Sequence, residues 1–240
     1  GNMLRKAIDY FCHFAVEPGF YKQLASGDPR FMASEYAQSI KWLKDDKEDI
    51  YDPEYSDMLR VSFMHVFGRG KLGDLVSLLS GRDFADRKFK EEIAEESFGK
   101  LRTGVLNYMN QYNFKNFVLA IKSAGFQSSR LLNSKMTLDF AYTLFLLLQQ
   151  SSEIPKVKIK RYVQKWFVLS TLTSRYIGSP ESQMDRDLRG IVSKGFPTFL
   201  EENEQAMLSD SFWDSRLVQN LETSSTTSPF FNTFLAAQIY

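Results

Sequence analysis

The sequence has few of the residues that catalytic and metal sites use most often. It contains one cysteine, Cys12, and two histidines, His13 and His65. A lone cysteine cannot form an internal disulfide, and both histidines lie inside apolar runs, which favours core positions over a catalytic base. Cys12 and His13 are adjacent, about 100° apart on a helix, so they do not converge on one metal ion. We predict no catalytic residue, no metal site and no cofactor.

Long hydrophobic stretches are also missing. The longest apolar run, FAYTLFLLL at Phe140–Leu148, is about half of the roughly 20 residues that a membrane span needs. We interpret it as a buried helix, preceded by Asp139, which we expect to interact with the helix dipole or an arginine. With no signal peptide in view and one cysteine, we predict a cytoplasmic protein without membrane contact.

Helix signals occur along almost the whole chain. Four capping residues stand before helical segments, three of them followed by proline: Asp28-Pro29, Ser134, Ser179-Pro180 and Ser228-Pro229. Gly125 and Gly195 follow periodic segments, where a left-handed residue would end each helix. No segment alternates apolar and polar residues as a half-buried strand does. We therefore predict an all-α fold, an irregular bundle of roughly ten helices with negligible sheet.

Two segments interrupt the helical pattern. KDDKEDIYDPEY at 44–55 is acidic and contains a proline, and ETSSTTSP at 222–229 is a polar tract. Both are short for a domain linker. A glycine-rich segment at 67–73, FGRGKLG, lacks the spacing of a phosphate-binding loop, and we expect a tight turn between helices. We predict one helical domain over residues 1–240, the alternative being two lobes that meet near 44–55.

Charge is unevenly distributed in the C-terminal part. Residues 151–195 contain nine Lys and Arg against four Asp and Glu, whereas residues 196–240 contain one against six. The two segments could lie side by side and neutralise each other. Alternatively, the basic segment stays exposed as a surface for phosphate.

The basic residues gather on the segment KVKIKRYVQKWFVLS at 156–170. Its apolar residues have the spacing of one helix face: Ile159, Tyr162, Val163, Trp166 and Phe167. Four cations lie off that face and are candidates for contact with DNA: Lys158, Lys160, Arg161 and Lys165. The alternative is an ordinary basic solvent face. Beyond them, Val168, Leu169 and Leu172 make the helix apolar nearly all round, so we expect its second half to be central in the core.

A corner between two helices follows, in LTSRYIGSPESQMDRDLR at 172–189. We expect the first helix to end near Ile177-Gly178, and the next to begin at Ser179-Pro180 with free N–H groups that suit an anion. The side chains that could bind phosphate or carboxylate there are Arg175, Ser179, Ser182 and Arg186, with Arg189 on the same side. Alternatively, Asp185 and Asp187 neutralise the arginines, and Asp185 can pair with Arg189. We call this arrangement, a set of ion pairs that only holds the corner together, a structural knot.

Parts of the sequence resemble a bacterial family. RYVQKWFVLSTLTSRYIGSPESQMDRDLRGI at 161–191 and LSDSFWDSRLVQNLETSSTTSPFFNTFLAAQIY at 208–240 look like the helical region of GmrSD-type modification-dependent restriction proteins. The N-terminal part of those proteins is a ParB/sulfiredoxin-like domain. The segments LLSGRDF, EEIAEESF and SAGF are similar to the same subgroup. The resemblance spans most of the chain after Leu59.

The family's catalytic motifs have no counterpart in this sequence. Members carry an Asp-Gly-Gln-Gln-Arg motif, and many add an HNH-like nuclease domain with a catalytic histidine. Here the pair Gln149-Gln150 has no glycine before it and no arginine after it, and no histidine follows His65. The resemblance therefore implies a middle-to-C-terminal helical piece of a longer protein. The partners of that piece would be the ParB/sulfiredoxin-like domain and a nuclease domain.

Two main functions remain as hypotheses. In the first, the chain is a non-catalytic helical module that supports, positions or dimerises the catalytic parts of a nucleic-acid-directed defence protein, with DNA contact through the basic helix. In the second, it is an enzyme or small-anion receptor whose site is the corner from Arg175 to Arg189. A scaffold role unrelated to nucleic acid is a third alternative.

Overall fold

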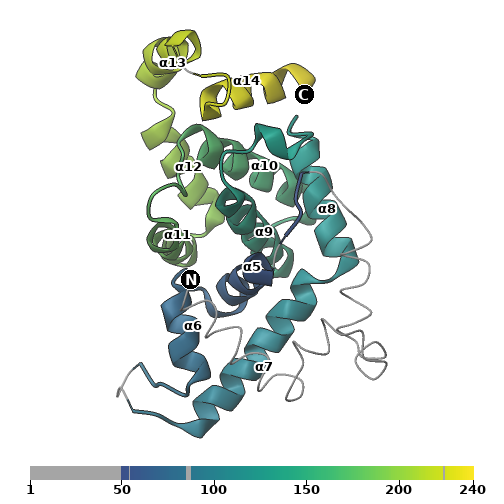
Figure 1. The fold of residues 1–240 in the computed structure, drawn as a ribbon, viewed down its shortest axis with the longest axis vertical. Helices are drawn as coiled ribbons and strands as arrows, with labels where there is room; N and C mark the ends of the chain where they lie inside the picture. Colours follow the sequence, from purple (N-terminus) through teal and green to yellow (C-terminus); the bar gives the residue numbers. More distant parts are fainter. Residues whose placement is uncertain (1–49, 54, 85–87, 224) are drawn as a thin grey trace. The chain divides into compact units, whose positions relative to one another are not determined.

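The computed structural model describes residues 50–53, 55–84, 88–223 and 225–240 (Figure 1). In these ranges the chain forms ten α-helices, α5 to α14, with one short 3₁₀ segment, η1, and one π-helix, η2. The same ranges contain no strand, only an isolated antiparallel bridge between Arg82 and Phe89. The prediction of an all-α, multi-helix fold is confirmed. No helix of the described ranges is long and apolar enough to cross a membrane.

Some predicted features lie outside the described residues. They are the helix start at Asp28-Pro29, the residues Cys12 and His13, and most of the predicted loop at 44–55.

The described residues divide into two compact units. One contains residues 53–114, and the other contains residues 50–52 and 115–240. The sequence predicted one domain, with an alternative division near 44–55. The chain passes from one unit to the other between residues 52 and 53 and again inside α8 (Gln111–Lys122), between Phe114 and Lys115.

The first unit contains α5 (Tyr55–Phe67), α6 (Leu72–Leu79) and α7 (Glu91–Tyr108), and α7 packs against both of the others. Gly104 of α7 permits close packing on α5, because a Cβ there would lie 2.8 Å from the carbonyl oxygen of Ser62. The turn predicted at 67–73 joins α5 to α6, and Gly68 in it has a φ of 63°. His65 is buried in α5, as predicted.

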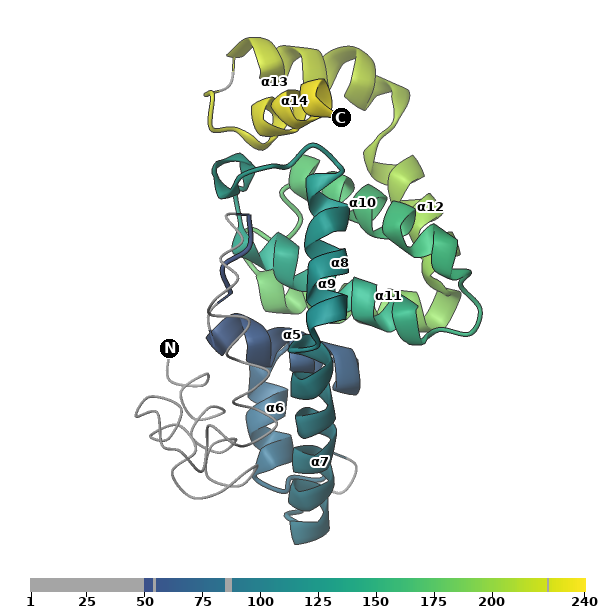
Figure 2. The same cartoon turned by 90° about the vertical axis from the view of Figure 1, so that its right-hand side faces the viewer.

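The second unit contains the remaining elements. After α8 come η1 (Ser129–Leu131), α9 (Lys135–Gln150), α10 (Lys156–Leu172), α11 (Pro180–Lys194), α12 (Phe196–Met207), η2 (Phe212–Leu217), α13 (Val218–Thr223) and α14 (Pro229–Ile239). Figures 1 and 2 show α9 and α10 in the middle of this unit, with α11 and α12 on one side and α13 and α14 at its end. α10 packs against α9, α12 and α14, so it connects the parts of the unit.

Helix α9 forms the centre of this core. Its cap is the predicted one, since the Ser134 hydroxyl accepts a hydrogen bond from the N–H of Met136. Every residue from Thr137 to Leu146 is buried, as expected for a helix that is apolar nearly all round. Asp139 lies fully inside, and one of its carboxylate oxygens accepts a hydrogen bond from the Tyr51 hydroxyl at 3.0 Å.

Helix α14 begins at its predicted cap and packs closely on the core. The Ser228 hydroxyl accepts a hydrogen bond from the N–H of Phe231. Gly125 has the predicted left-handed φ, 91°, and a Cβ there would lie 1.9 Å from the carbonyl oxygen of Ala236. Gly195 is also left-handed, with a φ of 75°. The predicted loop at 222–229 is three residues shorter than expected, because α13 extends to Thr223 and α14 begins at Pro229.

Helix α10 ends earlier than the sequence suggested. It stops at Leu172 rather than near Ile177-Gly178. Ser174 adopts a left-handed φ of 53°, and its N–H donates to the Thr171 carbonyl while the next N–H, of Arg175, donates to the Ser170 carbonyl. These two hydrogen bonds form a Schellman motif, which usually has glycine in the left-handed position. With serine there, the end of the helix carries no sequence signal.

Candidate functional site on helix α10

The N-terminal half of α10 has one buried and one exposed face. Ile159, Val163, Trp166 and Phe167 are buried and Tyr162 is half-buried, as the apolar spacing predicted. Three candidate cations are exposed: Lys158, Lys160 and Arg161. By helix geometry, Arg161 lies between the two lysines, about 60° from Lys158 and about 100° from Lys160. The side chains of these three residues form no ion pair or hydrogen bond with a described residue.

The fourth candidate cation of this helix, Lys165, is placed differently. Its Nζ lies 2.9 Å from a carboxylate oxygen of Glu204 on α12. A second pair joins Lys194 of α11 to Glu202 of α12. Two pairs thus connect the basic segment 151–195 to the acidic segment 196–240. Neutralisation between the two segments occurs at these points, and it does not extend to the first half of α10.

At the corner, Arg175 is paired with Asp187. The Nε of Arg175 lies 2.8 Å from one carboxylate oxygen, and Nη2 lies 2.6 Å from the other. The Tyr176 hydroxyl and the Gln183 side-chain amide donate to the same carboxylate, each at 2.9 Å. The Arg175 and Asp187 side chains are only 9% and 1% exposed. Asp187 therefore accepts four hydrogen bonds in a buried site.

Trp166 completes this arrangement from α10. The guanidinium of Arg175 lies over the indole ring, 4.9 Å from its centroid, and the indole N–H donates to the Tyr176 hydroxyl at 3.1 Å. Burial lowers the pKa of Arg175, but the hydrogen bonds and charge of Asp187 outweigh it, and the pKa is raised. Burial, and then the charge of Asp187, raise the pKa of Tyr176 well above its usual value. The guanidinium stays charged and the phenol stays neutral.

The other corner candidates do not join Arg175. Arg189 pairs with Asp185 at 2.5 Å, four residues apart on α11, as predicted. Arg186 is exposed and contacts only Gln183, at 3.4 Å, among the described residues. It lies about 100° around the helix from both aspartates, so it points to solvent. Ser179, which makes no capping hydrogen bond, and Ser182 are also exposed.

The corner therefore has the arrangement expected of a structural knot. Arg175 is occupied by Asp187 and is not brought together with Ser179, Ser182 and Arg186 to hold an anion. One detail differs from expectation. The arginines that the aspartates neutralise are Arg175 and Arg189, and Arg186 is not one of them.

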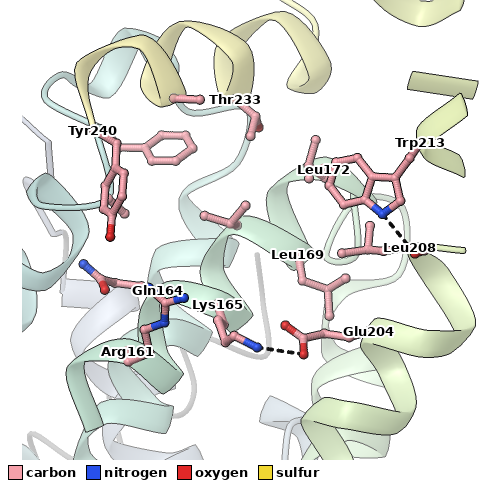
Figure 3. Close-up of a pocket in the computed structure, with 14 residues that line it drawn as sticks. Arg161, Gln164, Lys165, Leu169, Leu172, Glu204, Leu208, Trp213, Thr233 and Tyr240 are labelled. Carbon is pink, nitrogen blue, oxygen red and sulfur yellow. Dashed lines mark hydrogen bonds and ion pairs between the residues drawn. The ribbon is translucent and has the colours of Figure 1, made fainter. Parts of the chain in front are cut away.

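A cavity opens beside the second half of α10, between α10, α12, η2 and α14 (Figure 3). Its volume is about 290 Å³, and its lining is mostly apolar. The sequence predicted this half of α10 to be central in the core. Leu169 and Leu172 are indeed buried, but with half-buried Val168 they form one wall of the cavity. Figure 3 shows Trp213 and Tyr240 on opposite sides of it.

Sequence reasoning did not single out Trp213 or the cavity. Trp213 belongs to the π-helix η2, and its indole N–H donates to the Leu208 carbonyl at 3.0 Å. The sequence contained one indication of the cavity. Helix α10 has more apolar residues than a helix that packs on one side needs. The described residues contain no group of three or more His, Cys, Asp or Glu side chains that could hold a metal ion.

Comparison with family models, with curated proteins and with solved structures gives no match to this chain. The resemblance to GmrSD-type restriction proteins stays a prediction from the sequence.

Proposed function

We propose that this chain is a non-catalytic helical module of a bacterial restriction-like, nucleic-acid-directed defence protein, and that it contacts DNA through α10. The resemblance of residues 161–191 and 208–240 to GmrSD-type proteins supports the setting. In that setting, the module positions the catalytic parts of a longer protein, which are its partners. The contact with nucleic acid is supported by the charges on α10.

The observation that carries the proposal is where the unpaired cations lie. Lys158, Lys160 and Arg161 are exposed near the N-terminal end of α10, and no acidic residue stands in its first turn. The positive end of a helix dipole disfavours cations, at about 0.3 to 1 kcal/mol each within the first turn. Folding therefore does not favour a lysine at position 158, which lies in the first turn. A bound phosphate group would gain from both the side chains and the dipole.

Charge reversal tests this contact. The variant carries Lys158→Glu, Lys160→Glu and Arg161→Glu, and its binding to a short DNA duplex is measured by fluorescence anisotropy at several salt concentrations. If three phosphates are neutralised, the logarithm of affinity should fall with the logarithm of salt with a slope of about −2.7, or about 40-fold between 50 and 200 mM. The variant should lose this salt-dependent binding.

A matched control changes the net charge equally at another place. It carries Arg130→Glu, Arg186→Glu and Arg216→Glu, all exposed in the same unit. The control should keep most of the affinity. Equal losses in the two variants would show that only net charge matters, and unchanged binding in the α10 variant would contradict the proposal. The DNA should be recovered intact after incubation with Mg²⁺, because the module is proposed to be non-catalytic.

The second hypothesis, an anion site or enzyme site at the corner, has no observation in its favour. Its central cation, Arg175, is already held by Asp187.

A further inference from the structure

The cavity beside α10 has walls that are fixed by specific contacts. The indole of Trp213 is held by its hydrogen bond to the Leu208 carbonyl and by an edge-to-face contact with Phe212, with ring centroids 5.2 Å apart. Gly125 allows the backbone of α14 to approach closely at Ala236, next to Ala237, which lines the cavity. The space is therefore bounded on two sides by groups that are held by specific contacts.

The π-helix is an independent indication that the space is used. Such helices are rare and occur frequently at functional sites. Here η2 covers Phe212–Leu217 and places Trp213 at the edge of the cavity. An apolar gap also forfeits dispersion contacts for the residues that line it. A ligand with an apolar body would restore those contacts.

The polar groups of the cavity indicate the charge of that ligand. Lys165 is neutralised by Glu204, and the Gln164 amide group donates to the Ala120 carbonyl and the Ser123 hydroxyl. The Arg161 side chain forms no ion pair or hydrogen bond with a described residue, so it is the lining side chain whose charge is not compensated. In Figure 3 it lies below Tyr240, on the same side as Gln164 and Lys165. An anionic group at that edge would complete the pairing.

We propose that this cavity binds a medium-length aliphatic carboxylate, with its chain against Val168, Leu172 and Trp213 and its carboxylate on Arg161. The aliphatic wall from α10 favours a chain over a polar ring. The volume of about 290 Å³ is near the lower end of ligand pockets, about 300 to 1,000 Å³, which suits a small molecule better than a helix of a partner protein. The site shares Arg161 with the proposed DNA contact but does not depend on it.

Titration calorimetry with decanoate tests the proposal on the whole chain. We expect one site per chain, with Kd on the order of 0.1 to 1 mM for a ligand of this size. Decanol should bind more weakly, by up to about 5-fold, because it lacks the pair with an exposed arginine. Arg161→Gln should remove this preference by weakening decanoate and leaving decanol unchanged. Equal affinities for decanoate and decanol in the parent protein would overturn the role of Arg161.

Cavity-filling variants test the location. Ala237→Trp fills the space from α14, and Val168→Trp fills it from α10, so one can replace the other if either fails to fold. Each folded variant should lose decanoate binding at least 10-fold. Binding that survives in a folded filling variant would show that decanoate sits elsewhere and would overturn the proposal.

The decanoate site and the DNA contact can be tested independently of each other. Lys158→Glu with Lys160→Glu should weaken DNA binding and leave decanoate binding within about 2-fold, since neither lysine lines the cavity. Ala237→Trp should do the reverse. Loss of decanoate binding in the double lysine variant would contradict the assignment of the site.

Discussion

The buried pair of Arg175 and Asp187 gives the sharpest test of the corner. Arg175→Ala would leave a carboxylate that is 1% exposed with only the Tyr176 and Gln183 hydrogen bonds. Removing one partner of a buried pair costs about 3 to 5 kcal/mol. Because two donors remain, we expect the lower end, about 3 kcal/mol of unfolding free energy.

A second pair on the same helix is a matched control. Arg189 also binds an aspartate, Asp185, but its side chain is 71% exposed. The Asp185 side chain is 6% exposed, but a water-exposed guanidinium contributes less than a buried one, so Arg189→Ala should cost clearly less than Arg175→Ala. Urea unfolding followed by tryptophan fluorescence suits both variants, because Trp166 contacts Arg175 directly.

A double-mutant cycle completes the test. Asp187→Ala alone would leave a nearly buried guanidinium without its carboxylate, so it should also be strongly destabilising. The variant with both changes should lose less stability than the sum of the two single losses. If Arg175→Ala and Arg189→Ala cost the same within about 0.5 kcal/mol, the corner is not held by this pair.

Two further predictions concern stability. Burial raises the pKa of Tyr142 well above its usual value of about 10. At a pH between the usual and the raised pKa, the Tyr142 phenol keeps its proton in the folded chain and has lost it in the unfolded chain. Stability should fall as pH rises above about 10, by up to about 1.4 kcal/mol per pH unit for this group; an equal slope in Tyr142→Phe would refute it. Gly125 and Gly178 have similar φ values, 91° and 88°, but a Cβ at Gly178 meets nothing within 4 Å. Alanine should cost about 1 kcal/mol at Gly178 and clearly more at Gly125, and equal melting temperatures would contradict the close approach to Ala236.

The features that could be predicted from the sequence are local ones. Ser134 and Ser228 cap α9 and α14 because a capping hydrogen bond spans only two or three residues. The buried face of α10 follows from the spacing of its apolar residues alone. The pair of Asp185 and Arg189 also lies within one helix, four residues apart.

Features that depend on how helices cross could not be predicted. Arg175 follows the left-handed Ser174, beyond the end of α10, and it binds Asp187 rather than Asp185 of α11. Lys165 does not belong to the unpaired basic face, because Glu204 of α12 lies beside it and forms an ion pair with it. The cavity forms only where four elements meet. One of them is a π-helix, for which the segment FWDSRL gives no periodic signal.

Reversing the charges on α10 should change the stability of the fold and the affinity for DNA in different directions. The two effects can therefore be told apart. Lys158 lies in the first turn, where the helix dipole favours a carboxylate over an ammonium group. Charge reversal at Lys158, Lys160 and Arg161 should therefore leave the melting temperature unchanged or raise it, since none of them has a described partner to lose. A fall in DNA affinity in that variant would not come from unfolding. A lower melting temperature would mean that these cations stabilise the fold, and the argument that their placement serves binding would fail.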